Sequence, residues 1–233
     1  MQHIHVAGAG ALGSTTVDEL VKILIAVKAV AVIHLYDFDT VEERNLVSQN
    51  FYQYDLGQLK CEAVAKRHAG NNLVQVVPHN MKLTEDNLSE ILQATPGPVI
   101  CLLDNLPSRL DCWWAGYNNK CSVLQGAIAF NDTGFVEWTT QSDSTWTLDP
   151  TRTDPGIIHT ICQKEDVKLP PCELTIFRNL IINTSLCTAI AVALYLGYDI
   201  KGILPENTNT YGCAASFKCS TLEKELTTII VEA

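Results

Sequence analysis

The feature that most constrains this chain is a glycine-rich turn close to its start. His3–Ala7 reads as an apolar strand and leads directly into GAGALG at residues 8–13, after which apolar residues recur at helical spacing. In such a strand–turn–helix unit, Gly8 permits the tight turn, Gly10 lets a phosphate approach the backbone, and Gly13 lets the helix pack against the strand. The helix N-terminus then presents free N–H groups and partial positive charge to an anion. The turn predicts a nucleotide site, with a tight turn that binds nothing as the alternative.

Strand and helix patterns alternate after this turn. Alternation of this kind predicts parallel strands joined by helical crossovers, and therefore an α/β, Rossmann-like, doubly wound and mostly parallel sheet. Ligands bind such sheets at the carboxyl ends of the strands, so we expect the site at residues 8–13, Asp37 and Asp104. The predicted strands are His3–Ala7, Ala29–Tyr36, Leu73–Val77, Pro98–Leu103, Ser122–Ala129 and Gly134–Thr140, and the predicted helices are Leu12–Lys28, Gly57–His68, Thr84–Ala94 and Pro107–Asn119.

The second half of the chain is less regular. A polar, proline-interrupted stretch at about 141–171 reads as a long crossover connection, and connections of this length are usually functional or mobile. An apolar helix, Cys172–Leu196, follows it. Thr208–Phe217 and Thr227–Glu232 read as antiparallel C-terminal strands. With no internal repeat, we expect one domain over residues 1–233.

Composition excludes several kinds of partner. A net charge of −10 lacks the basic footprint that nucleic-acid binding needs. The apolar stretch Leu180–Tyr198 is interrupted by a polar run at 183–185, which favours a buried helix over a membrane span. No signal-peptide pattern opens the chain, and none of its nine cysteines forms Cys-x-x-Cys, so we expect reduced thiols in a cytoplasmic protein. Cys213 and Cys219 are poorly spaced for zinc, and no zinc is expected.

Asp37 closes the second predicted strand, after Tyr36. An acidic side chain there can accept hydrogen bonds from ribose hydroxyls, which suits NAD as well as ATP. The alternative is an aspartate that only stabilises a turn or caps a helix. Asp37 therefore supports a nucleotide without choosing between the two.

A set of short motifs narrows the choice of nucleotide. Their order and spacing over Val6–Arg109 resemble those of the ubiquitin-activating (E1-like) adenylyltransferase family that includes ThiF, MoeB and HesA. The chain looks like a short bacterial or phage-type member of that family, without its zinc Cys-x-x-Cys pairs. The motifs are the glycine turn, Asp37-Phe38-Asp39-Thr40-Val41, Asn45-Leu46, Gln49, Gly57-x-x-Lys60 and Asp104-Asn105-x-x-x-Arg109.

The resemblance implies that ATP and Mg²⁺ adenylate the C-terminal carboxylate of a ubiquitin-like protein or small peptide. Forming an acyl-adenylate requires charge stabilisation on the triphosphate and a metal for the departing pyrophosphate. Lys60 would supply a positive charge, Asn45 a neutral donor, and Asp104 a ligand for Mg²⁺, directly or through water. A solvated Lys60 and a helix-capping Asp104 are the alternatives. The expected cofactor-binding residues are Gly8, Gly10, Gly13, Asp37, Asp39, Asn45, Gln49, Lys60, Asp104 and Asn105.

One departure from the family pattern concerns catalysis. The family usually reads Asn-Leu-x-Arg-Gln, and this chain has Ser48 in place of the arginine. Arg44 lies four residues earlier and could substitute for it. Losing one phosphate-binding arginine can cost several powers of ten in rate. A nucleotide- or partner-binding pseudoenzyme is therefore the alternative function, and an NAD-dependent oxidoreductase ranks third.

The resemblance also suggests a reactive thiol. Cys172 follows Pro170 and Pro171 at the start of the long apolar helix, near where short bacterial relatives carry a cysteine. The positive end of the helix dipole favours a thiolate there. Cys162, in the crossover stretch, competes for the role, and simple core packing of Cys172 is the alternative. We expect a homodimer that passes its partner on as a thioester, with an E2-like protein as a possible acceptor.

Overall fold

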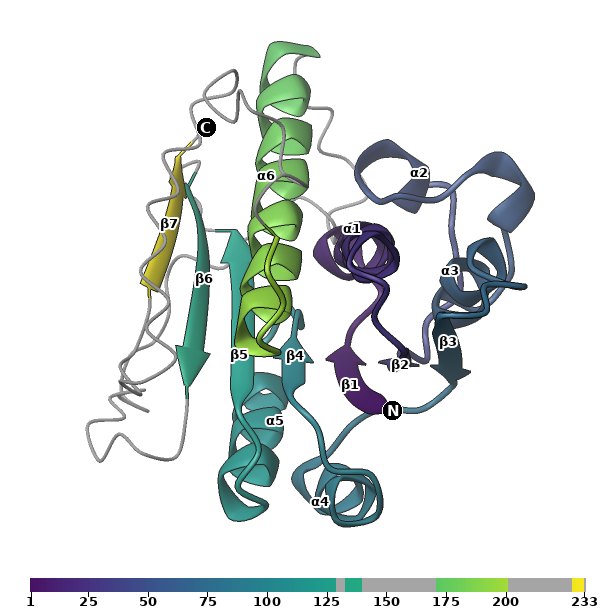
Figure 1. Cartoon of the computed structure of the whole chain (residues 1–233). Helices are drawn as coiled ribbons and strands as arrows, with labels where there is room; N and C mark the ends of the chain where they lie inside the picture. The colour runs from purple at the N-terminus through teal and green to yellow at the C-terminus, as the bar shows by residue number, and fades with distance from the viewer. Residues whose placement is uncertain (129–132, 140–170, 201–227, 233) are drawn as a thin grey trace.

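The structure is a computed structural model that describes all residues except 129–132, 140–170, 201–227 and 233. Its strands form one seven-stranded sheet in the order β3-β2-β1-β4-β5-β6-β7 (Figure 1). The strands are β1 (Gln2–Ala7), β2 (Ala31–Tyr36), β3 (Val74–His79), β4 (Val99–Cys101), β5 (Val123–Ile128), β6 (Thr133–Thr139) and β7 (Thr228–Glu232). The first five are parallel, while β6 pairs antiparallel with both β5 and β7.

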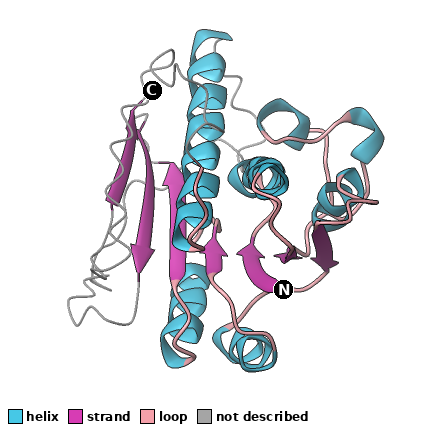
Figure 2. Cartoon of the chain, viewed as in Figure 1, coloured by secondary structure: helices cyan, strands magenta, loops and turns pink. Residues whose placement is uncertain are grey.

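Helices cover both faces of this sheet (Figure 2), which confirms the predicted Rossmann-like, mostly parallel α/β fold. One layer holds α1, α3 and α6, and the other holds α4 and α5. The helices are α1 (Ala11–Ala26), α2 (Asn45–Ser48), α3 (Lys60–Arg67), α4 (Glu85–Ala94), α5 (Leu106–Asn118) and α6 (Pro171–Tyr195), with a 3₁₀ turn at Gln53–Asp55. The predicted strand Thr208–Phe217 and the crossover stretch at about 141–171, except for its last residue, lie outside the described residues.

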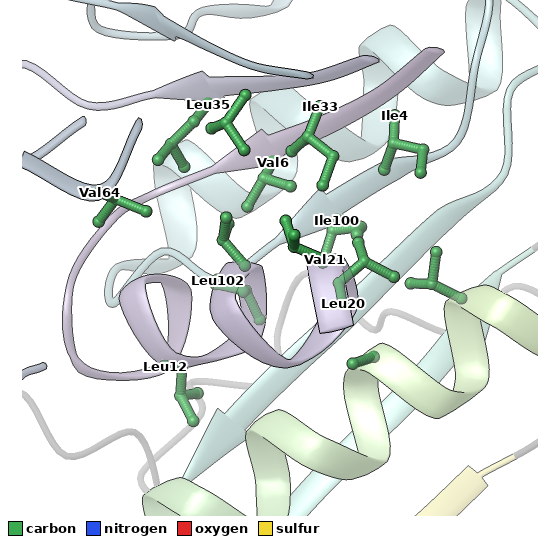
Figure 3. Close-up of a cluster of buried hydrophobic side chains, with 14 of the residues drawn as sticks. Ile4, Val6, Leu12, Leu20, Val21, Ile33, Leu35, Val64, Ile100 and Leu102 are labelled. Atoms are coloured by element: carbon green, nitrogen blue, oxygen red, sulfur yellow. The ribbon is translucent and has the colours of Figure 1, made fainter. Parts of the chain in front are cut away.

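The larger core lies between the sheet and α1. Ile4 and Val6 of β1 alternate toward this face, as do Ile33 and Leu35 of β2, and they meet the buried face of α1 that includes Leu20 (Figure 3). Burying each such side chain contributes about 1.5–3 kcal/mol. This packing fixes the start of α1, and with it the glycine turn, against the carboxyl ends of β1 and β2.

Helix α6 contains buried polar residues that join it to the rest of the core. Ser185 Oγ donates a hydrogen bond to the carbonyl of Leu12 at the start of α1, at 3.2 Å. Thr188 Oγ1 donates to the carbonyl of Thr184, one turn earlier, at 2.7 Å. The segment Arg178–Tyr195 is long and apolar enough to cross a membrane, but most of it is buried within the protein. Its packing against α1 makes it a core helix.

Four histidines, His3, His5, His34 and His79, lie across β1, β2 and β3 and form what we call the histidine row. His34 hydrogen-bonds to His3 at 2.9 Å and to His79 at 3.1 Å. His5 Nε2 lies 2.8 Å from the carbonyl of Thr95, which can only accept, so this nitrogen carries the proton. Burial, above all, lowers the pKa of His5 and of His34 to about 4. The buried part of the row is therefore neutral at pH 7.

The neutral histidine row predicts acid sensitivity. An unfolded histidine titrates near pH 6.5, so between about pH 6.5 and 4 the unfolded chain binds protons that folded His5 does not. The free energy of unfolding is therefore at its full value above pH 6.5 and decreases as the pH falls toward 4. In urea titrations at several pH values, His5→Gln should lower the free energy of unfolding at pH 7. The free energy of unfolding should also fall less between pH 7 and 4.5 in this variant than in the wild type, by about 2 kcal/mol. Parallel pH profiles for the two proteins would contradict this.

Candidate functional site

The glycine turn places its three glycines in different environments. Gly8 has a φ of +96°, which L side chains rarely adopt, and its N–H donates to the carbonyl of Tyr36 at 2.9 Å. A Cβ on Gly13 would lie 1.9 Å from the Gly8 carbonyl oxygen, so helix and turn can approach this closely only through glycine. A Cβ on Gly10 would meet no atom within 4 Å. Gly8 and Gly13 serve the fold, and Gly10 faces open space.

That open space is a pocket of about 450 Å³ at the carboxyl ends of the parallel strands. Gly10 is the N-cap of α1 and has no side-chain cap, and the first turn of α1 carries no acidic residue. Free N–H groups and the positive end of the helix dipole are therefore available to an anion. The sequence-predicted residues that line the pocket are Gly8, Gly10, Asp37, Asp39, Gln49, Lys60, Asp104 and Asn105.

Asp37 joins the glycine turn to the end of β2. One carboxylate oxygen accepts the N–H of Ala9 at 2.7 Å, and the other accepts the N–H of Asp39 at 2.8 Å. Burial raises the pKa of Asp37, while the two N–H groups and nearby Lys60 oppose that shift. The side chain therefore stabilises the turn, which was the alternative interpretation of Asp37. It also lines the pocket in which a ribose-binding residue is predicted.

Lys60 begins α3 and directs its ammonium group toward the pocket. It is only 7% exposed, which excludes a solvated helix lysine. Its Nζ lies 2.9 Å from Asp39 Oδ2, and its backbone N–H donates to the Asp39 carbonyl at 2.8 Å. The buried lysine is thus held by a half-exposed carboxylate, and both groups line the pocket.

Asp104 and Asn105 divide two tasks at the end of β4. Asn105 is the N-cap of α5, and its Oδ1 accepts the N–H of Ser108 at 3.0 Å. Its Nδ2 donates to Asp104 Oδ1 at 3.3 Å. Because Asn105 caps the helix, the exposed Asp104 carboxylate lines the pocket instead of capping. Arg109 is 4% exposed and donates to the carbonyls of Leu103 and Gly126. These bonds fix the backbone after β4 against β5 beside the pocket.

The short helix α2 places its predicted site residues differently. Gln49 lines the pocket, and its Oε1 is buried with no hydrogen-bond partner in the described part of the chain. Asn45 lies outside the pocket lining and is 4% exposed, with its Oδ1 accepting the N–H of Glu42 at 2.9 Å. Arg44 is paired with Glu42 at 2.6 Å and is exposed. The structure therefore brings Gln49, but neither Asn45 nor Arg44, to the pocket wall.

Sequence reasoning gave no site role to several residues that line the pocket. Phe38 is 55% exposed between the two aspartates, and Met81 and Lys82 follow β3. Lys82 is an exposed cation at this edge. Ligands bind at the carboxyl ends of parallel strands, and β3 is one of these strands. This rule could have identified Lys82, which follows β3, as a candidate site residue.

The predicted reactive thiol lies in the first turn of α6, which begins at Pro171. The side chain of Cys172 and the whole of Cys162 are outside the described residues. The cysteines whose side chains are described are buried or half-buried, and burial raises the pKa of the Cys61 thiol. Within the same described set, no group of three or more His, Cys, Asp and Glu side chains is placed to hold a metal ion.

Comparisons with known proteins agree with this fold. The sequence model of the ThiF family matches residues 1–196. No curated protein sequence matches the chain. Among solved structures, one similar chain is TcdA (CsdL), with a TM-score of 0.50 and 23% sequence identity over 57% of this chain. The match spans 53% of that chain, about half of its length, and identity this low bears on the fold alone.

The glycine geometry predicts that two similar substitutions destabilise the protein to very different extents. Gly13→Ala should destabilise the fold by about 1–3 kcal/mol or more, because the new methyl group would collide with the Gly8 carbonyl. Gly10→Ala should cost less than about 1 kcal/mol, because its methyl group would project into open space. Urea denaturation of the two variants measures this directly. Equal destabilisation by both would show that the turn is arranged differently.

Proposed function

The chain belongs to the ThiF family of E1-like proteins, whose members are adenylyltransferases, and from that premise we propose that it adenylates a C-terminal carboxylate with ATP and Mg²⁺. The proposed substrate is a ubiquitin-like protein or a small peptide with a free C-terminus. We place the protein in the cytoplasm, acting as a homodimer.

One observation carries this proposal. The glycine turn, Asp37, Lys60 and Asp104 are far apart in the sequence, and all of them line one pocket at the carboxyl end of the sheet. An uncapped helix N-terminus and a buried lysine supply positive charge for phosphates, and Asp37 lies beside the turn where a ribose would bind. A site for the nucleotide of an adenylation reaction needs these elements together.

The residues present also suit a magnesium ion. Asp104 offers an exposed carboxylate in the pocket lining, and Mg²⁺ is bound in proteins by one or two carboxylates together with substrate phosphates. Asp104 would hold the ion directly or through water. When bound, the ion would neutralise charge on the departing pyrophosphate.

The chain's own groups can assist the proposed transfer. A carboxylate oxygen of the partner's C-terminus forms a bond to the α-phosphorus, and the bond from that phosphorus to the bridging oxygen of pyrophosphate breaks. The first-turn N–H groups of α1 and the Lys60 ammonium are fixed donors that stabilise negative charge on the phosphates. Asp39 holds the Lys60 ammonium in place, and an arriving phosphate would share the ammonium with that carboxylate.

A pseudoenzyme is the second candidate, and the surroundings of Ser48 favour it. Ser48 replaces the family arginine, and the nearest arginine in the sequence, Arg44, is engaged with Glu42 and lies outside the pocket lining. Among the described cations that line the pocket, Arg109 is committed to backbone carbonyls. The positive charge available to a triphosphate there comes from Lys60 and Lys82.

Cys172 is the proposed acceptor of the activated partner. It would attack the acyl-adenylate, forming a thioester and releasing AMP, before transfer to an E2-like protein. Its place in the first turn of α6 supports this, because helix N-termini favour thiolates.

The nucleotide assignment predicts the effects of two substitutions. Lys60→Met keeps the buried stem but removes the charge, and Asp104→Ala removes the metal ligand. Each should weaken ATP–Mg²⁺ binding at least about tenfold in calorimetry, since a charge-assisted hydrogen bond contributes about 1.5–3 kcal/mol. Glu19→Ala, which removes an exposed ion pair on α1, is the control and should bind as the wild type does. Unchanged ATP affinity in both variants, or tighter binding of NAD than of ATP, would refute the assignment.

The enzyme and pseudoenzyme alternatives differ in their response at Ser48. If the missing arginine limits the reaction, Ser48→Arg should raise ATP–pyrophosphate exchange at least about tenfold in the presence of a cognate partner. If Arg44 already contributes its charge, Arg44→Ala should abolish exchange and Ser48→Arg should change little. An absence of exchange in every variant, with a proven partner present, would favour the pseudoenzyme.

The thiol assignment predicts selective alkylation. At pH 7, iodoacetamide should label Cys172 faster than the buried Cys61, as read by mass-spectrometric mapping. Cys172→Ala should form no reducible adduct with the partner in the presence of ATP. An adduct that persists in this variant would transfer the role to another cysteine, with Cys162 the first to test.

A further inference from the structure

We propose that Asp18, Asn50 and Arg67 form a tether that holds Gln49 in position to contact the nucleotide. This inference rests on the proposed function, because it concerns the same pocket. The three residues come from α1, from the loop after α2 and from the end of α3. None of them lines the pocket, so they act as positioning residues through Gln49.

Asn50 is held at three points, immediately after Gln49. Its backbone N–H donates to Ser14 Oγ at 3.3 Å, and its side-chain Nδ2 donates to Asp18 Oδ2 at 2.6 Å. Its carbonyl accepts a hydrogen bond from Arg67 Nη2. Backbone and side chain are therefore both fixed at this residue, which leaves little freedom for the preceding one.

Asp18 is the centre of the tether. Its Oδ2 also lies 3.2 Å from Arg67 Nη1, and its Oδ1 lies 2.7 Å from His68 Nε2. Both charged side chains are mostly buried, with exposures of 15% for Asp18 and 16% for Arg67. Hydrogen bonds between charged groups are stronger than neutral ones, and shielding from water reduces their screening.

The guanidinium of Arg67 extends the tether along the loop. It lies 5.4 Å from the ring centre of Phe51 and 5.5 Å from that of Tyr52, within cation–π range. It also lies 3.5 Å from Asp55, whose carboxylate accepts the N–H of Tyr52 at 3.0 Å. The segment from Asn50 to Asp55 is thus attached to α3 as well as to α1.

Gln49 gives this attachment a function. Gln49 lines the pocket, and its Oε1 is buried and has no partner among the described residues. A buried acceptor without a partner is costly, so a ligand with a hydroxyl or amino donor gains by satisfying it. Ser14 lies on the helix that follows the glycine turn. Because the Asn50 N–H donates to Ser14, the residue after Gln49 is attached to the helix whose N-terminus would bind the phosphates.

A double-mutant cycle tests the tether. Calorimetry would measure ATP–Mg²⁺ affinity for the wild type, Gln49→Ala, Asn50→Ala and the double variant. We expect each single substitution to weaken binding about fivefold to tenfold, and the double variant to bind no more weakly than the weaker single variant. The two losses coincide because Asn50 acts only through Gln49. Losses that multiply, or wild-type affinity in either single variant, would overturn the proposal.

Controls separate positioning from stability. Asn50→Ala removes one hydrogen bond to Asp18 but leaves the pairs of Asp18 with Arg67 and His68 in place, so its thermal midpoint should fall by only a few degrees. In the ligand-free protein it should increase amide hydrogen exchange in residues 49–52, whereas Glu19→Ala should not. Unchanged exchange in Asn50→Ala would overturn the tether. A wild type that binds no ATP would overturn the proposed function and this inference with it, while tight wild-type binding with normal affinity in Asn50→Ala would overturn the inference alone.

Discussion

The carboxylate of Asp37 holds the site together. It accepts N–H groups from Ala9, within the glycine turn, and from Asp39, which starts the loop toward Lys60. The turn leaves β1 and the loop leaves β2, and one main-chain bond, from the Gly8 N–H to the Tyr36 carbonyl, joins the turn to the end of β2. The two bonds to Asp37 add a side-chain link between the turn and the loop. The core on the α1 face brings the ends of β1 and β2 together. Asp37 then fixes the glycine turn and the loop that follow these two strands.

The fold could be predicted because each of its signals is local. Apolar spacing in residues 12–28 and the β-rich runs before and after it specify helix and strand without reference to the rest of the chain. Helix α2 escaped prediction because four residues are too few to show a helical period. The histidine row escaped because it depends on register: His5 lies beside His34 only when β1 and β2 pair in parallel as they do.

Site residues that lie directly after strands could be predicted from the sequence, and residues that lie in loops were harder to place. Asp37 and Asp104 line the pocket because they follow the ends of β2 and β4, while Lys60 reaches it at the start of α3. Asn45 is directed inward by a loop closed through its bond to Glu42, which no motif reveals. The sequence offered Asp104 as a possible cap of α5, whereas the structure gives that role to Asn105. Both residue types suit an N-cap, so the backbone path decides between them.

The ion pair between Lys60 and Asp39 affects which kinds of ligand the pocket can bind well. An anion that engages the lysine competes with a carboxylate 2.9 Å away and leaves that carboxylate with less of its counter-charge. A simple anion such as sulfate therefore exchanges one negative partner for another and gains little. A ligand that brings positive as well as negative charge can complement both members of the pair at once. The pair of Lys60 and Asp39 is therefore better complemented by a ligand that carries both charges than by a small anion.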